Sequence, residues 1–464
     1  MLHTRFPLVT NPLICCLVGL IISWLPSMQV SAAVLQLPGT MKVINNPDNH
    51  AIFSCLIKHP LPADARQPTT LQLYLDSGGN IYPEADFLPE NPEDIRRPSG
   101  EVNTEGDLQW YFDRSANQPI RDKLFDHYNI NIPKSQQLTA SNHIGEPYDT
   151  VAWDALRRAM AYQVAHSINT ATGMGKKTLV VLIHGYNVAD YEQAATGPCG
   201  RADVGSKGPY YVAIQDSMLK LRPELQNAIW LEVCWDGLQS HDLEIWGAAQ
   251  ASARYVGLGL REVLRQTDSQ TPIRVFTHSA GGVVISQALW NNDAFDDGSE
   301  GRYEHQLEKM MHSIPTLTHT DVRVGMMVPA LTPQAFAYYT QRSPETSQAT
   351  AYRIVVGQNH RDFPINKFLA GCNRAGSTCM GANVAAVQDA KEALGDAYRE
   401  LLQSQDFCVT KPGYWSWAPS EFRQSSFFHR YEVHDWRLYF KRRPIGEAST
   451  AQPIMTAFLH KVLD

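Results

Sequence analysis

The sequence predicts an α/β protein with a mostly parallel central sheet and helices on both faces. First, residues 178–183 (T-L-V-V-L-I) form an unbroken apolar, β-prone run, as in strands buried on both faces. Second, a similar run at 228–235 is followed by apolar residues at helical spacing from about 243 to 265. Third, an apolar run beginning at Val275 turns directly into a helix-compatible segment. Such alternation is expected of a parallel sheet with right-handed crossovers.

The turn after that third strand carries the most specific chemical signal. Residues 275–284 read V-F-T-H-S-A-G-G-V-V, with Ser279 inside a small-residue turn. This is the layout of a nucleophile elbow, in which a strand turns sharply into a helix and raises a serine hydroxyl above the sheet. Ala280 and Gly281 supply the small neighbours. Thr277 replaces the first glycine of G-x-S-x-G, so the match is incomplete and a purely structural turn is the alternative.

A second motif lies upstream, where the 178–183 strand runs into His184-Gly185-Tyr186-Asn187. Through V-L-I-H-G-Y-N and T-H-S-A-G-G, the chain resembles the α/β-hydrolase superfamily of serine hydrolases, esterases and lipases among them, over roughly residues 150–440. The resemblance implies that fold, with insertions near the active site. It also implies an oxyanion hole formed by the backbone N–H groups of Tyr186 and Ala280. His184 is expected to brace its loop by hydrogen bonding and not to act as a base.

The superfamily order of serine, acid and histidine directs the search for an acid to the region after the elbow. Strands are expected at 322–328 and 353–357, and Asp362 follows the second of them. Asp362 is the predicted acid, with a turn aspartate or a partner of Arg361 as the alternative. Asp321 precedes its strand, which places it at the wrong end of a parallel sheet.

The predicted base is His434, directly after a short last strand at 427–433. His429 is the alternative, although it would lie within that strand. His360 is too close to the acid to be oriented by it. His241 precedes the serine and fits only an unusual triad.

These assignments predict a secreted serine hydrolase that cleaves carboxylic esters, lipid esters included, through an acyl-enzyme. Its substrate is a small-molecule or lipid ester, and the chemistry needs no cofactor and no metal. The alternatives are a non-catalytic binding protein of the same fold, and a peptidase or acyltransferase with the same triad. The acyl chain, the leaving group and the oligomeric state stay open. A net charge of −7 without a basic block speaks against nucleic-acid binding.

The 464-residue chain divides into a signal peptide at 1–32, an N-terminal region at 33–150 and a catalytic domain at 151–464. Two insertions, 190–223 and 366–425, are expected to shape the active site.

Within these parts, strands are expected at 51–57 and 70–75. The N-terminal region is expected to supply the first, antiparallel strands of the sheet and, in addition, a decorated lobe. Helices are expected at 149–168 and at about 383–402.

The N-terminus predicts export. Arg5 is followed by an apolar stretch from Leu13 to Leu25 and by small residues near Ala32 and Ala33, which is the pattern of a cleaved signal peptide. The stretch is short for a membrane span, although an uncleaved anchor is the alternative. Six cysteines follow it, and an even number in an exported chain, bacterial and periplasmic or secreted, indicates disulfides. Cys372 and Cys379 are the best candidate pair.

Overall fold

A computed structural model describes twelve segments of the chain, which include the central sheet and the helices packed on it. The described residues are 35–36, 69–76, 78–89, 107–130, 150–185, 210–235, 245–290, 317–336, 352–359, 379–396, 398–407 and 451–464.

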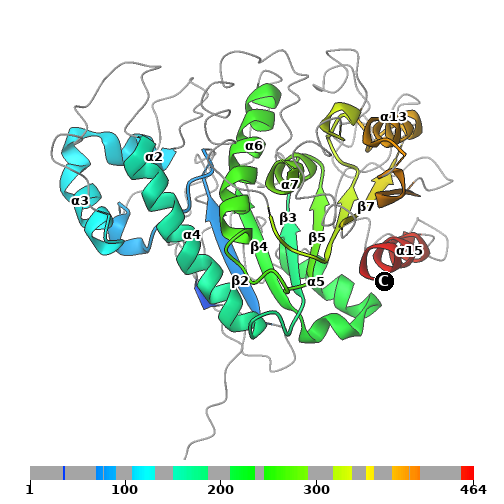
Figure 1. The fold of residues 1–464 in the computed structure, drawn as a ribbon, viewed down its shortest axis with the longest axis horizontal. Helices are drawn as coiled ribbons and strands as arrows, with labels where there is room; N and C mark the ends of the chain where they lie inside the picture. The colour runs from blue at the N-terminus through cyan, green and yellow to red at the C-terminus, as the bar shows by residue number, and fades with distance from the viewer. Residues whose placement is uncertain are drawn as a thin grey trace, which may run out of the picture.

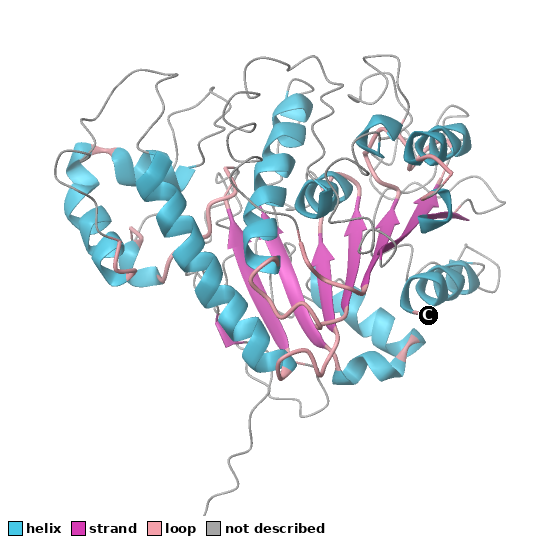
Figure 2. Cartoon of the chain, viewed as in Figure 1, coloured by secondary structure: helices cyan, strands magenta, loops and turns pink. Residues whose placement is uncertain are grey.

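The core is an eight-stranded sheet in which every strand pairing is parallel (Figure 1). In spatial order the strands are β1 (Leu35–Gln36), β2 (Thr70–Leu75), β4 (Ile229–Trp235), β3 (Leu179–Ile183), β5 (Ile273–His278), β6 (Val322–Met327), β7 (Tyr352–Gln358) and β8 (Leu402–Asp406). Because all strands run the same way, their carboxyl ends meet at one edge, the upper edge in Figure 2. The predicted α/β class with a mostly parallel sheet is confirmed.

Helices flank the sheet, and those of residues 107–127 lie to one side of it (Figures 1 and 2). The α-helices are α2 (Asp107–Asp113), α3 (Gln118–His127), α4 (Thr150–Thr172), α5 (Tyr210–Leu221), α6 (Ile245–Leu264), α7 (Gly281–Trp290), α13 (Val384–Leu394) and α15 (Ala451–Leu463). Short 3-10 helices are η2 (Ala85–Phe87), η4 (Ser115–Asn117), η8 (Pro223–Asn227), η9 (Pro333–Phe336) and η10 (Arg399–Leu401).

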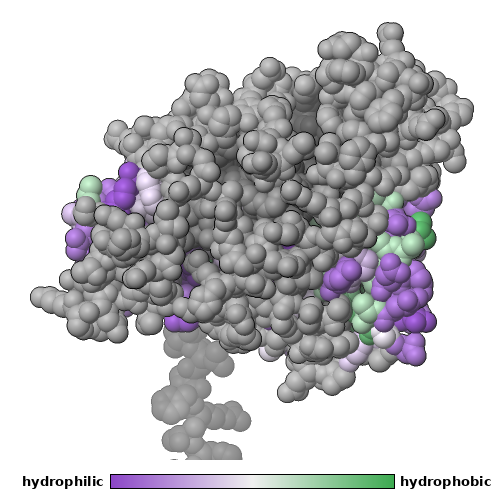
Figure 3. All heavy atoms as spheres, turned by 90° about the horizontal axis from the view of Figure 1, so that it is seen from above, coloured by the Kyte–Doolittle hydropathy of each residue, from purple (hydrophilic) through white to green (hydrophobic). Residues whose placement is uncertain are grey.

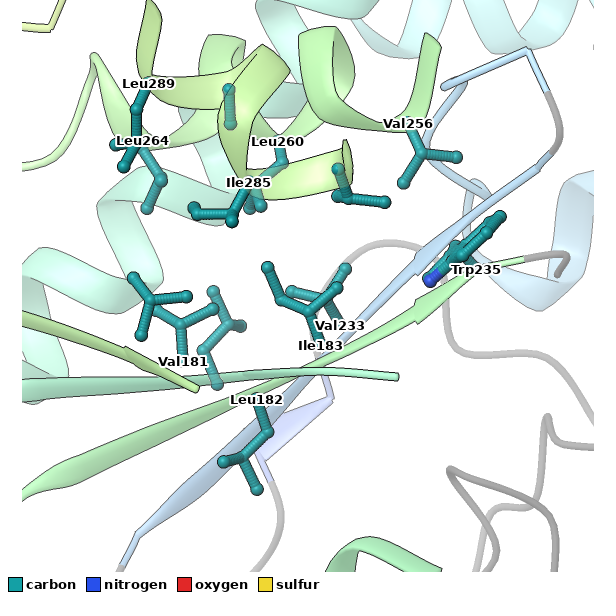
Figure 4. Packing of buried hydrophobic residues seen from close by; sticks show 14 of the residues in the cluster. Val181, Leu182, Ile183, Val233, Trp235, Val256, Leu260, Leu264, Ile285 and Leu289 are labelled. Atoms are coloured by element: carbon teal, nitrogen blue, oxygen red, sulfur yellow. The ribbon is translucent and has the colours of Figure 1, made fainter. Parts of the chain in front are cut away.

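The alternation of side chains along each strand divides these helices between the two faces. Val181 and Ile183 of β3 point toward α6 and α7, where Leu260 and Ile285 meet them, whereas Leu182 points the other way (Figure 4). Because both faces are covered, all five residues of β3 are buried. This explains why its sequence is continuously apolar instead of alternating.

The opposite face is covered by α5 and α15. The Phe276 ring, on the same face as its register partner Leu182, meets Phe458 of α15 with ring centroids 6.4 Å apart. At the other side of that face, Gln215 of α5 donates a hydrogen bond to the Thr70 hydroxyl of β2 (3.0 Å). Helices therefore lie on both faces, as the sequence predicted.

The N-terminal region differs from the sequence prediction. Its strands do not lead the sheet as antiparallel strands: β1 pairs parallel with β2, and β2 pairs parallel with β4 over six residues. The decorated lobe contains α2 and α3, which pack beside α4 because Trp153 contacts the rings of Phe112 and Phe125 (centroids 6.1 and 5.6 Å). The expected strand at 51–57 lies outside the described residues.

A second difference concerns the predicted insertion at 366–425. The helix expected there over 383–402 ends at Leu394, because Gly395 follows with a φ of +72° that a helix cannot continue. The chain then forms β8, whose Leu402 pairs with Ile354 of β7. Part of the expected insertion is thus a strand of the central sheet, and the expected last strand at 427–433 lies outside the described residues.

Few large apolar side chains are exposed in the described segments. In the view onto the carboxyl edge, the described residues at the two sides mix hydrophilic and hydrophobic side chains (Figure 3). The large apolar side chains that are exposed in the described segments, Tyr162, Met174 and Val384, are scattered over different places in the chain. None of the described helices combines the length and the apolar character that crossing a membrane requires.

Candidate active site

The serine turn has the backbone geometry that a nucleophile elbow needs. Ser279 lies between the end of β5 and the start of α7, with a φ of +52°. A non-glycine residue rarely adopts this left-handed conformation, and such strain concentrates at functional sites. Two neighbouring segments hold it: Ser279 N–H donates to the Met327 carbonyl (3.1 Å), and the Ser279 carbonyl accepts from Gly282 (3.0 Å) and Ala330 (3.0 Å).

The first turn of α7 presents a backbone donor beside this serine. Within the described segments, no group accepts a hydrogen bond from Ala280 N–H, whereas the Ala280 carbonyl accepts from Val283 (2.9 Å). The first N–H groups of a helix have no partner within the helix, and its dipole favours negative charge at that end. Within the described segments, Ala280 N–H thus has no acceptor that would compete with an oxygen atom next to Ser279.

The two sequence motifs, nearly one hundred residues apart, are in direct contact. A Cβ on Gly185 would lie 2.7 Å from the Ser279 Cβ and 2.8 Å from the His278 carbonyl. A Cβ on Gly281 would lie 2.7 Å from the carbonyls of both Ile183 and His184. Real Cβ atoms do not approach so closely, so each motif needs its glycine in order to pack against the other.

A strap of residues 328–331 supports the elbow from the other side. The strap leaves β6 at Val328, a β-branched residue with a φ of +41°, which is itself strained. It is pinned on both flanks: Val328 N–H donates to the Gly357 carbonyl (2.9 Å), and Gly381 N–H donates to the Pro329 carbonyl (3.1 Å). The elbow is thus connected to β6, β7 and the segment before α13.

His184 is held by both of its ring nitrogens. Nδ1 lies 2.8 Å from the Gly185 carbonyl, and Nε2 lies 3.1 Å from the Trp235 backbone nitrogen. Since the Trp235 N–H can only donate, Nε2 accepts, and the proton of the neutral ring is on Nδ1. Burial lowers the pKa of His184 to about 4. With no free nitrogen, His184 braces its loop and is not available as the base for Ser279.

Two aromatic residues complete this brace. The Trp235 ring stacks on the His184 ring (centroids 5.4 Å, interplanar angle 13°), and its Nε1–H donates to the His184 carbonyl (3.0 Å). The Tyr211 hydroxyl accepts from His184 N–H (2.8 Å) and donates to the Val233 carbonyl (2.6 Å). We call His184, Tyr211 and Trp235 the aromatic brace. Sequence reasoning missed the two aromatics, because the end of a strand, where Trp235 lies, and the start of a helix, where Tyr211 lies, are positions shared with many packing residues.

Cys234 and Cys379 are both buried and disulfide-bonded. Cys234 is on β4, whereas Cys379 lies beside the strap after β6, because Met380 N–H donates to the Leu331 carbonyl (2.9 Å). The pairing of Cys379 with Cys372 stays a prediction, because Cys372 lies outside the described residues.

The predicted site residues are thus described in part. Ser279 and Ala280 lie together at the carboxyl edge, in contact with His184-Gly185. Tyr186, Asp362 and His434 are outside the described residues. β7 ends at the same edge, at Gln358, and the N–H of the next residue, Asn359, donates to the Gly381 carbonyl (2.7 Å).

Asp321, set aside as an acid because it precedes its strand, lies at the opposite edge. Its carboxylate pairs with the guanidinium groups of Arg274 (2.7 Å) and Arg323 (3.4 Å). Its role is structural, as its position in the sequence indicated.

No group of three or more histidine, cysteine or acidic side chains suited to a metal ion occurs within the described segments.

Comparisons of the chain with models of known families, with curated proteins and with solved structures gave no match.

Proposed function

We propose that this protein is a serine hydrolase of the α/β-hydrolase fold that cleaves carboxylic esters, lipid esters among them. The observation that carries the proposal is the contact of Gly185 with Ser279, whose φ is +52°. A strained serine at the carboxyl end of a central strand, with a helix N-terminus behind it and a His-Gly loop against it, is the arrangement that acyl transfer needs.

In the proposed mechanism the Ser279 hydroxyl attacks the ester carbonyl carbon while His434 takes its proton. Asp362 holds the imidazole tautomer and stabilises the imidazolium. The carbonyl oxygen, now negative, is bound by the N–H groups of Ala280 and Tyr186, each worth roughly 3–4 kcal/mol. His434 then protonates the leaving alkoxide, and water hydrolyses the acyl-enzyme by the same steps.

Two rival functions use the same residues differently. A binding protein of this fold would keep the elbow without turnover, and a peptidase or acyltransferase would direct the same acyl-enzyme to another reaction. The strained φ of Ser279 favours an enzyme, because strained residues cluster at active sites and this one carries a hydroxyl at the carboxyl edge of the sheet.

Labelling with a fluorophosphonate tests the proposed nucleophile. The wild-type protein will react at one serine, and Ser279→Ala will abolish the reaction. Ser286→Ala is the matched control: Ser286 is also buried, seven residues further along in α7, and donates to the Val283 carbonyl (2.9 Å). Unchanged labelling of Ser279→Ala would refute the proposal. If labelling depends on Ser279, the rates on a panel of esters and peptides separate an esterase from a peptidase.

We also propose that the protein works outside the cytoplasm, in a bacterial periplasm or beyond. The N-terminal pattern up to Ala33 predicts a cleaved leader, and the disulfides of Cys234 and Cys379 fit an oxidising compartment. Intact-mass analysis of protein produced with its own leader tests this: the mature chain should begin at Ala33 or Val34. An unprocessed chain contradicts export by this route.

A further inference from the structure

We propose that Trp235 and Tyr211 are positioning residues that set the place of the His184-Gly185 loop against the nucleophile. The inference rests on the proposed function for its catalytic consequence, and on the described contacts alone for its structural part. It deepens the site by naming two residues whose printed hydrogen bonds go to His184 and to β4.

The first step is that the brace acts on the loop backbone and not on β3 as a whole. Both backbone groups of His184 are bonded by it: the N–H donates to the Tyr211 hydroxyl, and the carbonyl accepts from Trp235 Nε1–H. Through the ring, Nδ1–H also binds the Gly185 carbonyl. Three bonds therefore determine the path of the chain over the two residues at which it leaves the strand.

The second step is that the chain at His184 and Gly185 tolerates almost no displacement. The Gly185 Cα lies so close to Ser279 that even one added carbon would meet the Ser279 Cβ at 2.7 Å. From the other side, Gly281 approaches the His184 carbonyl just as closely. A small displacement of His184 therefore changes the distance between the loop and the elbow directly. Misplacement by about 1 Å is enough to cost roughly a hundredfold in rate.

The third step is that the brace is anchored to rigid elements. Trp235 ends β4, which pairs with β3 over five residues, and the Tyr211 hydroxyl donates to the Val233 carbonyl of the same strand. All three members of the brace are buried. A lost bond cannot be replaced by water, so the loop must shift or keep an unpaired polar group.

Trp235→Phe tests the inference, because phenylalanine keeps an aromatic ring at this position and cannot make the Nε1–H bond to the His184 carbonyl. The buried volume that is also lost is matched in the control variant below. We expect kcat on a short-chain nitrophenyl ester to fall about tenfold, with KM changed less than about twofold. Tyr211→Phe removes two bonds and is expected to act in the same direction and more strongly.

Trp230→Phe is the matched control. Trp230 is on the same strand, equally buried, and also donates from its indole to a backbone carbonyl, that of Leu225 (3.2 Å), but near the other edge of the sheet. It should lose a similar amount of stability and keep its kcat. Equal losses of kcat in Trp235→Phe and Trp230→Phe would overturn the inference.

Hydrogen exchange separates this inference from the proposed function. In Trp235→Phe, and not in Trp230→Phe, the peptide that ends at Gly185 should exchange faster than in the wild type. A wild-type protein that does not react with a fluorophosphonate refutes the proposed function, and exchange then decides the inference. Unchanged exchange in Trp235→Phe refutes the positioning role whether or not the protein is active.

Discussion

At the scale of single residues, the site depends on residues whose backbone is strained and is held in place by hydrogen bonds to neighbouring backbone segments. Ser279 and Val328 both have positive φ values, at the ends of neighbouring strands. Each such residue costs on the order of 1–3 kcal/mol, which the surrounding hydrogen bonds must offset. The Met327 carbonyl, which binds Ser279 N–H, and the Gly357 carbonyl, which binds Val328 N–H, are among these partners.

Gly185→Ala is expected to lower both activity and stability. The new methyl group would overlap Ser279 and the His278 carbonyl, and neither can retreat, because His278 ends β5 and Ser279 is hydrogen-bonded to Met327 and Ala330. Overpacking of this kind costs about 1–3 kcal/mol, and we expect at least a tenfold loss of kcat. Ester turnover and urea unfolding measure the two effects.

Gly395→Ala is the control for that substitution. Gly395 has a φ of +72° and a ψ of 171°, a conformation nearly confined to glycine, with nothing within 4 Å of its Cβ position, so alanine brings strain of about 1–3 kcal/mol and no collision. It should leave turnover unchanged. Normal turnover in Gly185→Ala would show that the loop does not press on the nucleophile.

At the scale of elements, disulfide bonds at Cys234 and Cys379 secure segments near the carboxyl edge of the sheet. The segment 379–382 carries Cys379 at one end and lies against the strap at Gly381, whose Cβ would meet the Val328 carbonyl carbon at 2.3 Å. The strap in turn bonds Ser279 through Ala330. A disulfide, a short segment and the strap thus form a continuous support for the elbow.

Alkylation without reductant tests these disulfides. In the denatured, unreduced protein neither Cys234 nor Cys379 should react, because both are already bonded. Cys379→Ser should lower the free energy of unfolding by about 2–5 kcal/mol. Mass mapping identifies the labelled cysteines. Alkylation of Cys379 in unreduced protein would contradict the support described above.

At the scale of the whole molecule, two buried histidines make stability depend on pH. Burial lowers the pKa of His184 and of His319 to about 4 in each case. His319 Nε2 bonds the Thr267 hydroxyl (2.9 Å), and the negative charge of Asp268 only partly opposes the effect of burial. In the unfolded chain both histidines titrate near 6.5.

The native protein should therefore lose stability as the pH falls from 6.5 to 4. In this window the unfolded chain binds protons that the folded chain does not, so each histidine lowers the free energy of unfolding by about 1.4 kcal/mol per pH unit. Above pH 6.5 both are neutral in either state and contribute no pH dependence.

Urea unfolding at several pH values measures this slope. His319→Gln keeps a polar partner for Thr267 and should reduce the slope by the share of one histidine. A variant with the same slope as the wild type would show that His319 is not the group that binds the proton.

The sequence alone predicted the parallel sheet, the strand-turn-helix at Ser279 and the exclusion of Asp321, because these follow from local periodicity and from the order of elements along the chain. It also placed His184 as a brace. For Tyr186, Asp362 and His434 the assignments remain predictions.

Only the tertiary structure decided what depends on residues far apart in the chain. The parallel pairing of β2 with β4 and the strand β8 were missed, since a short polar segment such as Leu402–Asp406 becomes a strand only beside β7. The contact of Gly185 with Ser279 and the brace from Tyr211 and Trp235 were likewise invisible, because no local pattern records which side chains meet when distant strands end at one edge.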